Sequence, residues 1–216
     1  MLQCYIAEIS LVEDTQTFEF WLEKVNSQRR EKVLHCKNEK DKQRSLVAGM
    51  LLRHALEQEG ISYEDAVFSK TKEGKPFLES HENLHFSISH AGEYAVCVIS
   101  DTAVGVDIEC MDKSAFQDGK EKRLQAMAKR CFSETEWKCF EQAEDKPKLF
   151  LEYWTKKEAY SKAVGKGLGM DFSGIDTERE RKSYWSEWLH KGYCISIYSN
   201  LISMCIKKIE YVFDIK

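Results

Sequence analysis

The sequence has little proline and lacks the segments that export or membrane insertion would require. Two of its 216 residues are proline, and no glycine- or serine-rich linker or low-complexity stretch interrupts it. No apolar run approaches the ~20 residues of a membrane-spanning helix, and the N-terminus lacks the basic-then-apolar layout of a signal peptide. We therefore expect a cytoplasmic protein without a membrane partner, its halves packed into one body rather than joined like beads on a string.

A net positive charge is also missing. Lysine and arginine together number 32 against 36 aspartate and glutamate residues, which gives a formal net charge of −4. Nucleic-acid binders usually present a broad basic field, so this balance argues against a nucleic-acid partner. Any anionic ligand must then be held by a local cluster of cations.

The eight cysteines show no metal-site or redox spacing. The sequence contains no C-x-x-C motif and no cysteine–histidine group spaced for zinc. Eight cysteines are enough for a disulfide framework, but such frameworks belong to exported proteins. The absence of an export signal favours reduced thiols that pack as small core residues.

Aromatic and apolar residues are plentiful, and they indicate a folded chain of mixed α+β class. Tryptophan, tyrosine and phenylalanine make up 12% of the residues, which excludes a mostly disordered protein. Hydrophobic periodicity predicts strands and helices in the order strand, helices, strands, helices, strands. The expected strands cover residues 3–11, 84–89, 94–100, 104–109, 193–198, 202–206 and 209–213. The short spacers between 84 and 109 suit an antiparallel meander of three strands.

Local signals mark the ends of the expected helices. An apolar stripe at residues 18–25 has helical spacing, and a second amphipathic segment follows Arg44 and ends near Gly60. Ser133 and Glu136 have the spacing of a capping box. Residues 147–165 predict another helix, with proline at its start and glycine at its end. Residues 71–76 read as a turn.

A pair of carboxylates on one strand is the first candidate for chemistry. Asp107 and Glu109 lie two residues apart in Gly-Val-Asp-Ile-Glu, so they point to the same face of the expected strand. Adjacent carboxylates repel each other unless a cation joins them, and Mg²⁺ prefers such oxygen ligands. The alternative is two solvated acids on an exposed face.

The second candidate lies in the helix of residues 147–165. Glu158 and Lys162 are four residues apart and share a helix face, as an ordinary surface ion pair also would. The glycine-rich end of this helix, residues 165–169, adds weight to the functional interpretation. Three glycines there suggest a backbone that turns sharply or lets a ligand approach closely.

Cations and hydroxyl groups in the first half form a third set. Ser87, Ser89 and His90 end an expected strand, where a histidine can bind phosphate or only bond to a turn. Lys75 stands between Gly74 and Pro76, on a stiff loop. Arg44 precedes an apolar helix within a basic run, which is usually a solvated face.

Taken in order, these motifs are more specific than each is alone. Gly-Lys-Pro, Phe-Ser-Ile-Ser-His, Gly-Val-Asp-Ile-Glu, Phe-Ser-x-x-Glu and Trp-x-x-Lys-Glu-Ala-x-x-Lys follow one another between residues 74 and 162. This series resembles the 4′-phosphopantetheinyl transferases of the Sfp type. The resemblance implies two similar α/β halves related by a pseudo-twofold axis, expected at 1–105 and 106–216, with the active site at their junction. A fused pair of this kind is expected to be a monomer.

The resemblance also implies a reaction and a metal. The family moves the phosphopantetheine arm of coenzyme A onto a serine of an apo acyl or peptidyl carrier protein and releases adenosine 3′,5′-bisphosphate. By similarity, Asp107, Glu109 and Glu158 hold Mg²⁺, with Glu109 bound directly or through a water. Glu158 is also the candidate general base, and a metal-bound water is the alternative. Lys162 neutralises phosphate charge and can protonate the leaving group.

Coenzyme A binding is assigned by the same resemblance. The residues expected to bind it are Arg44, Lys75, Ser89 and His90, with Arg44 and His90 near the 3′-phosphate. Arg29 and Lys32 are second-tier candidates for that phosphate. Many relatives have asparagine where Ser87 stands, and serine or threonine where Ala91 stands. The contacts of these two positions with coenzyme A are therefore expected to differ from those in such relatives. The acidic carrier protein is expected to dock through local basic and apolar residues. Fatty-acid, polyketide and nonribosomal-peptide carriers all remain open.

Two other functions use the same residues. A Mg²⁺-dependent nucleotide phosphohydrolase would split the pyrophosphate with water, but the sequence contains no phosphohydrolase motif. A non-catalytic module that binds coenzyme A or the carrier would be expected to lose Asp107, Glu158 or Lys162, and all three are present.

Overall fold

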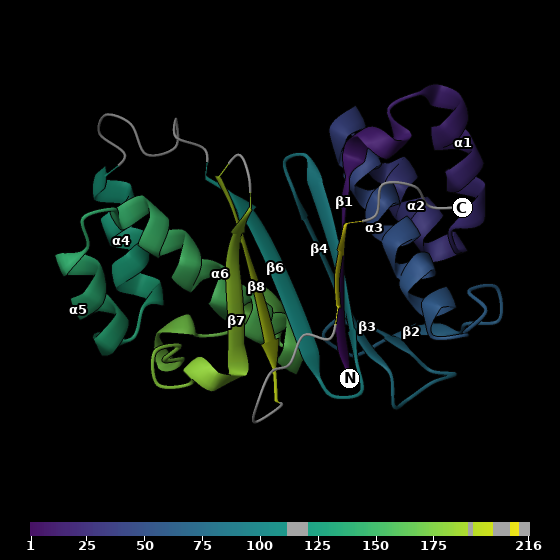
Figure 1. Ribbon diagram of the computed structural model, residues 1–216. Helices are drawn as coiled ribbons and strands as arrows, with labels where there is room; N and C mark the ends of the chain where they lie inside the picture. Colours follow the sequence, from purple (N-terminus) through teal and green to yellow (C-terminus); the bar gives the residue numbers. More distant parts are fainter. Residues whose placement is uncertain (112–120, 190–191, 201–207, 212–216) are drawn as a thin grey trace. The chain divides into compact units, whose positions relative to one another are not determined.

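The computed structural model describes residues 1–111, 121–189, 192–200 and 208–211 (Figure 1). The chain forms two compact units. The first contains Met1–Ala103 together with Cys205–Lys216, and the second contains Val104–Met204. Among the described residues, no helix is long and apolar enough to cross a membrane. The mixture of helices and small sheets confirms the predicted α+β class.

The first unit is built on a four-stranded sheet of order β4-β5-β1-β9. Strands β1 (Leu2–Glu8), β5 (Tyr94–Ser100) and β4 (His85–Ala91) pair antiparallel, whereas β9 (Lys208–Tyr211) runs parallel to β1. Every residue of β5 is buried, as expected for a central strand. A 3-10 helix, η1 (Ile9–Val12), follows β1.

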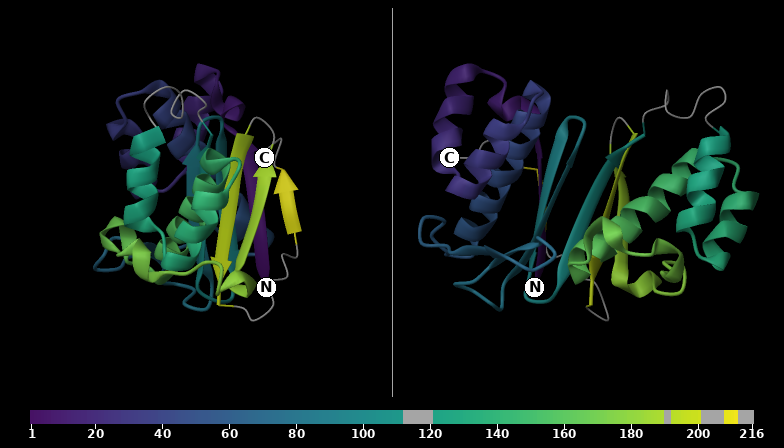
Figure 2. Two further views of the ribbon diagram at one scale, coloured as in Figure 1. Left: turned by 90° about the vertical axis from the view of Figure 1, so that its left-hand side faces the viewer. Right: turned by 180° about the vertical axis from the view of Figure 1, so that it is seen from behind.

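Three helices cover one face of this sheet (Figures 1 and 2). They are α1 (Thr15–Lys24), α2 (Ser27–His35) and α3 (Glu39–Gln58). Their N-cap side chains are Asp14, Asn26 and Asn38, each of which accepts a backbone N–H of the first turn. The middle of α3 is apolar and packs on β4, β5 and β1, so this long helix forms the centre of the core.

A hairpin completes the first unit. Strands β2 (Phe68–Lys70) and β3 (Pro76–Leu78) pair antiparallel around the turn predicted at 71–76. Gly74 has a φ of 88°, which few other residues adopt. Lys75 is therefore held next to a tight turn.

The second unit packs one long helix on a smaller sheet. Strands β6 (Val104–Cys110), β8 (Tyr193–Ser199) and β7 (Tyr184–Leu189) form an antiparallel sheet of order β6-β8-β7. Helix α6 (Lys146–Val164) lies on β6 and β8, and three short 3-10 helices follow it: η3 (Gly167–Gly169), η4 (Phe172–Gly174) and η5 (Arg181–Ser183). Pro147 lies in its first turn, and Gly165 ends it with a φ of 76°, as predicted.

Two shorter helices pack beside α6. They are α4 (Glu121–Cys131) and α5 (Glu134–Gln142), and the predicted capping box of Ser133 and Glu136 opens α5. Aromatic side chains join the three helices, with the Phe132 ring 5.2–5.5 Å from the rings of Phe140, Phe150 and Tyr153. This cluster forms a second core.

The predicted three-stranded meander is wrong. The first two runs form the hairpin β4–β5, but the third, β6, pairs with β8 in another sheet. Residues 101–103 look like a short hairpin spacer in the sequence, but the chain passes there from one unit to the other. Strand β7 was not anticipated, and the strand expected at 202–206 lies outside the described residues.

The tail divides between the units. Strand β8 belongs to the second unit, but β9 adds to the sheet of the first. The expected halves at 1–105 and 106–216 thus differ from the units in the place of this last strand. The seven cysteines within the described residues are free thiols.

Candidate active site

The close approach of β6 and α6 positions the carboxylates of the second unit. A Cβ atom on Gly105 would lie 1.9 Å from the backbone oxygen of Ala159 and 2.6 Å from the backbone nitrogen of Ala163. Only glycine fits such a contact. On the neighbouring strand β8, Ser196 is the register partner of Asp107 and hydrogen-bonds to Thr155 of α6 over 2.7 Å. The helix is thus fixed against the strand that carries the acidic motif.

An ion pair joins the strand motif to the helix motif. The Lys162 ammonium of α6 donates to Asp107 Oδ1 of β6 over 2.6 Å. The Asp107 carboxylate is buried, whereas 30% of the Lys162 side chain is exposed. Two motifs that are 55 residues apart in sequence therefore meet at one point.

The other two carboxylates lie in the same electrostatic environment. Burial is the main cause of the raised pKa of Glu158; the charge of Asp107 adds to the effect, and that of Lys162 opposes it. Burial likewise raises the pKa of Glu109 to about 7. The negative charge of Asp107 contributes to this shift more than that of Glu158, and Lys162 opposes it. Three acids and one lysine therefore lie close enough for the charge of one to affect the others.

Trp154 belongs to this group, although the sequence argument assigned it no role. Its indole lies within hydrogen-bonding reach of Glu109, and this contact lowers the carboxyl pKa against the larger effect of burial. Trp154 stands one helical turn before Glu158 on α6. The tryptophan of the Trp-x-x-Lys-Glu motif was the available signal for this contact.

The donor set fits a hard divalent cation. Oxygen atoms of three buried or half-buried carboxylates are the ligands that Mg²⁺ takes in proteins. Glu158 Oε1 is buried and receives no hydrogen bond from the described residues. As they stand, however, no three acidic, histidine or cysteine side chains of the described ranges close around a common metal position. The positive charge beside Asp107 is that of Lys162.

In the first unit, Arg44 and His90 belong to the same region. Arg44 of α3 donates to the backbone oxygen of Gly92 over 2.9 Å and forms an ion pair with Asp41. Gly92 lies in the β4–β5 turn, two residues after His90. Ser89 is buried and His90 half-buried at the end of β4. The structure therefore brings Arg44 to the turn that follows the Ser-His pair.

Lys75 is half-buried in the β2–β3 turn. Burial lowers the pKa of its ammonium to about 8. Burial also lowers the pKa of His85, and the charge of Lys75 adds to this effect. An ammonium in such a position gains from a bound anion, because the anion compensates for the lost hydration.

A cavity of about 450 Å³ lies between α2 and the hairpin. Arg29 and Lys32 line it, whereas Arg44, Lys75, Ser89 and His90, all described residues, do not. Burial lowers the pKa of the Arg29 guanidinium. Its Nη1 atom is buried without a hydrogen-bond partner among the described residues. Such a group is suited to receive a phosphate or carboxylate oxygen.

His35 and Lys70 also line this cavity, and the sequence argument missed them. Arg29, Lys32 and His35 follow at intervals of three along α2, a spacing that places them on one helix face. That periodicity was the available signal. Lys70 ends β2, and no local sequence pattern relates it to α2.

Comparison with protein families identifies both parts of the chain. The profile of the 4′-phosphopantetheinyl transferase superfamily matches residues 103–209. A second profile, for the N-terminal part of a 4′-phosphopantetheinyl transferase, matches residues 13–102. The two matches meet at the boundary between the structural units.

Curated relatives carry the same activity in their names. The 4′-phosphopantetheinyl transferase gsp of Aneurinibacillus migulanus is 28% identical over 97% of this chain and 92% of its own length. The transferase Sfp of Bacillus subtilis (strain 168) is 28% identical over 68% of this chain and 62% of its own. The L-aminoadipate-semialdehyde dehydrogenase-phosphopantetheinyl transferase of Saccharomyces cerevisiae is 29% identical over 80% and 65%. With both family profiles, these matches show that the chain belongs to the 4′-phosphopantetheinyl transferase superfamily.

Proposed function

We propose that this chain transfers the 4′-phosphopantetheine arm of coenzyme A to a serine hydroxyl of an apo carrier protein, with Mg²⁺ as cofactor and adenosine 3′,5′-bisphosphate as the second product. The serine oxygen attacks the phosphorus that bears the pantetheine arm, and the bond to the adenosine phosphate breaks. One observation carries the assignment: β6 and α6 bring Asp107, Glu109, Glu158 and Lys162 into one coupled group.

Asp107, Glu109 and Glu158 would hold the metal. A bound Mg²⁺ supplies positive charge to the pyrophosphate of coenzyme A. The buried Glu158 Oε1, which no described residue hydrogen-bonds, supports this role, as does the repulsion among the three acids. A cation relieves both costs, because it pairs with the charged form of each carboxylate.

Glu158 and Lys162 would handle the protons. Burial raises the pKa of Glu158 towards neutrality, and a carboxylate of raised pKa is a better base for the carrier serine. A water held by the metal is the alternative base. Lys162 keeps part of its side chain exposed, so its ammonium can neutralise phosphate charge and protonate the departing phosphate.

Coenzyme A would be bound by the cations of the first unit. The cavity with Arg29 and Lys32 is suited to a phosphate, since the Arg29 guanidinium has a buried N–H to donate. Arg44, Lys75, Ser89 and His90 would bind the remaining phosphates and the adenosine. The first unit would thus supply cations for coenzyme A, and the second unit the acids and Lys162 for the metal and the proton transfers.

The acidic carrier protein would dock through basic and apolar residues beside this site. We propose a monomeric, cytoplasmic enzyme that uses neither a membrane nor a nucleic acid. Free cysteines in the described parts of the chain agree with a reducing compartment.

The test is the intact mass of an apo carrier protein after incubation with this chain, coenzyme A and Mg²⁺. We expect the carrier to gain the mass of one phosphopantetheine. The gain should disappear with EDTA and with the Glu158→Gln variant. The matched control is Glu141→Gln, which neutralises an exposed carboxylate on α5 and should leave the gain unchanged.

Two other results would contradict the proposal. Release of adenosine bisphosphate without carrier modification, across several unrelated carriers, would identify a phosphohydrolase. Coenzyme A binding without any turnover would identify a non-catalytic binding module.

A further inference from the structure

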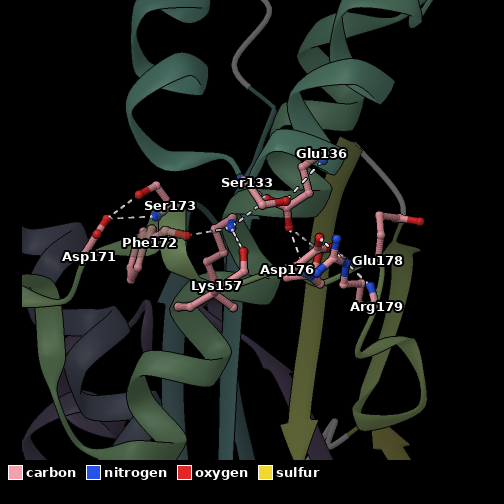
Figure 3. Close-up of polar contacts among 11 residues, drawn as sticks. Ser133, Glu136, Lys157, Asp171, Phe172, Ser173, Asp176, Glu178 and Arg179 are labelled. Atoms are coloured by element: carbon pink, nitrogen blue, oxygen red, sulfur yellow. Dashed lines mark hydrogen bonds and ion pairs between the residues drawn. The ribbon is translucent and has the colours of Figure 1, made fainter.

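A buried ion pair joins α5 to α6 (Figure 3), and its lysine directly precedes the proposed base Glu158 in the sequence. Lys157 Nζ is 2.6 Å from Glu136 Oε2, and neither side chain is exposed. Lys157 also donates to the backbone oxygens of Phe172, over 2.8 Å, and Ile175, over 2.5 Å. An ammonium has three N–H groups, and these three contacts use all of them.

Glu136 is equally well satisfied. Its Oε2 accepts the backbone N–H of Ser133 over 2.8 Å, which closes the capping box of α5. Its Oε1 accepts the backbone N–H and the hydroxyl of Thr177, over 2.9 and 2.7 Å. One carboxylate therefore joins the start of α5, the middle of α6 and the loop that follows α6.

The ion pair of Lys157 and Glu136 holds the loop at residues 171–177 in place. Asp171 caps η4 by accepting the N–H of Ser173. The backbone oxygens of Phe172 and Ile175 are both bound to Lys157. The ammonium of Lys157 thus fixes the position of Phe172 relative to α6.

Phe172 in turn contacts Trp154. The two rings meet edge to face with centroids 5.7 Å apart. Phe150 stacks on Trp154 at 6.1 Å with an interplanar angle of 11°. The indole thus contacts both phenylalanines, and its N–H lies within reach of Glu109. A continuous series of contacts therefore runs from the ion pair to a proposed metal ligand.

A buried ion pair is a weak source of stability, because the lost hydration of two charges offsets most of their attraction. It does impose a precise geometry on the groups that it hydrogen-bonds. We propose that Lys157 and Glu136 are positioning residues for phosphopantetheine transfer, and that they act on Glu109 through the loop at 171–177 and Trp154. This inference rests on the proposed role of Glu109 in the reaction.

The first test is the variant Trp154→Phe. Phenylalanine keeps the ring contacts with Phe150 and Phe172 but has no N–H to donate to Glu109. We expect kcat to fall roughly tenfold with an unchanged KM for coenzyme A. Mn²⁺ binding is measured in the substrate-free protein from the rise in melting temperature with Mn²⁺ concentration. The Mn²⁺ midpoint, the concentration that gives half of the maximal rise, should increase roughly tenfold.

The second test removes both charges together, in the variant Lys157→Met/Glu136→Gln. The amide keeps an oxygen acceptor for the capping box, whereas the loop carbonyls lose their donor. We expect the same changes in kcat and in the Mn²⁺ midpoint. Because all three residues act through one series of contacts, adding Trp154→Phe to this variant should produce little further loss. Additive losses, or a folded variant with the parent's kcat and Mn²⁺ midpoint, would overturn the inference.

Lys138→Met is the matched control. Lys138 also pairs with a glutamate, Glu134, over 2.7 Å, but both side chains are exposed on α5. This variant should keep the parent's kcat and Mn²⁺ midpoint. A parent chain that binds Mn²⁺ but transfers nothing would contradict the proposed function alone, and the Mn²⁺ midpoints would still decide the inference. A parent that gains no stability from Mn²⁺ would overturn the inference together with the metal assignment.

Discussion

Both units pack a long helix on a small sheet, yet the candidate functional residues of the second unit are three acids and one lysine, whereas those of the first are mainly cations. In the second unit, the acids stand on β6 and α6 themselves, where burial raises the pKa of Glu109 and Glu158. In the first unit, the cations stand on the short helix α2, on the hairpin and near the β4–β5 turn. Regular elements hold the acids of the second unit rigidly, whereas a turn and a short helix carry Lys75, Arg29 and Lys32, three of the cations that would bind a long, flexible ligand.

The largest effect is expected from a substitution in the second unit, which should lower kcat without weakening the binding of coenzyme A. Asp107→Asn removes the charge that pairs with Lys162 and leaves the shape of the side chain nearly unchanged. We expect kcat to fall by about 10³-fold, comparable to the loss of a group that stabilises transition-state charge. The binding of coenzyme A, measured by calorimetry, should change little. A comparable loss of coenzyme A affinity would contradict the assignment of catalysis to the second unit and of coenzyme A binding to the first.

The contact between β6 and α6 gives the next largest effect. Gly105→Ala would place a methyl group against two backbone atoms of α6, which cannot move as a flexible side chain can. We expect the free energy of unfolding to fall by about 3 kcal/mol, and transfer activity to fall with it. Urea denaturation measures the stability.

Gly169→Ala is the control for this prediction. A Cβ atom at Gly169 would meet no atom within 4 Å, so its stability should stay close to that of the parent. Equal stability of the Gly105→Ala variant would mean that the strand and the helix are less tightly joined than the structure indicates.

The cations of the first unit should affect substrate binding. In the double variant Arg29→Gln/Lys32→Ala, the cavity loses two positive charges. We expect KM for coenzyme A to rise roughly tenfold while kcat stays within about twofold, because these residues bind ground and transition states alike. Lys37→Ala, at an exposed lysine between α2 and α3, is the control. A fall in kcat with constant KM would assign the cavity to the chemical step instead.

The smallest effect is a pH dependence of stability in the second unit. The folded protein keeps the Glu109 proton up to pH of about 7, since burial raises its pKa, whereas the unfolded chain loses it near the ordinary value of 4.5. Folding therefore takes up a proton in this window, and stability falls as the pH rises through it.

We expect the parent in EDTA to lose about 1 to 2 kcal/mol between pH 5 and 8 relative to Glu109→Gln, after allowance for partial solvent screening. Urea denaturation at several pH values measures this difference. Parallel curves for the two proteins would show that the Glu109 carboxyl is solvated.

The placement of the candidate residues on helices and strands was more predictable in the second unit than in the first. The i, i+2 spacing of Asp107 and Glu109 and the i, i+4 spacing of Glu158 and Lys162 are local, so each motif could be placed on its element. Residues 101–103 misled because a three-residue spacer fits a hairpin as well as a crossing between units. Strand pairing depends on segments that are distant in the sequence. Strand β6 pairs with β8, which begins more than 80 residues after β6 ends.

The cavity of the first unit was only partly predictable. Arg29 and Lys32 were candidates because of the basic run, but the burial of Arg29 depends on packing that the run does not encode. The stem of Arg29 lies over Gly49 of α3, where a Cβ atom would approach its Cγ to 2.8 Å. The contact of Trp154 with Glu109 likewise depends on how α6 lies against β6, which only the folded chain defines.

The parallel pairing of β9 with β1 has a consequence for how the protein is made. The second unit is continuous in sequence, so its described strands and helices are synthesised one after another without interruption. This unit can therefore fold as soon as its own residues have been made. The first unit begins earlier, yet one of its edge strands arrives almost a whole chain length after the strand beside it. Until then, one edge of β1 presents open backbone groups to other chains. The open edge of β1 therefore exposes the nascent protein to aggregation until β9 is synthesised.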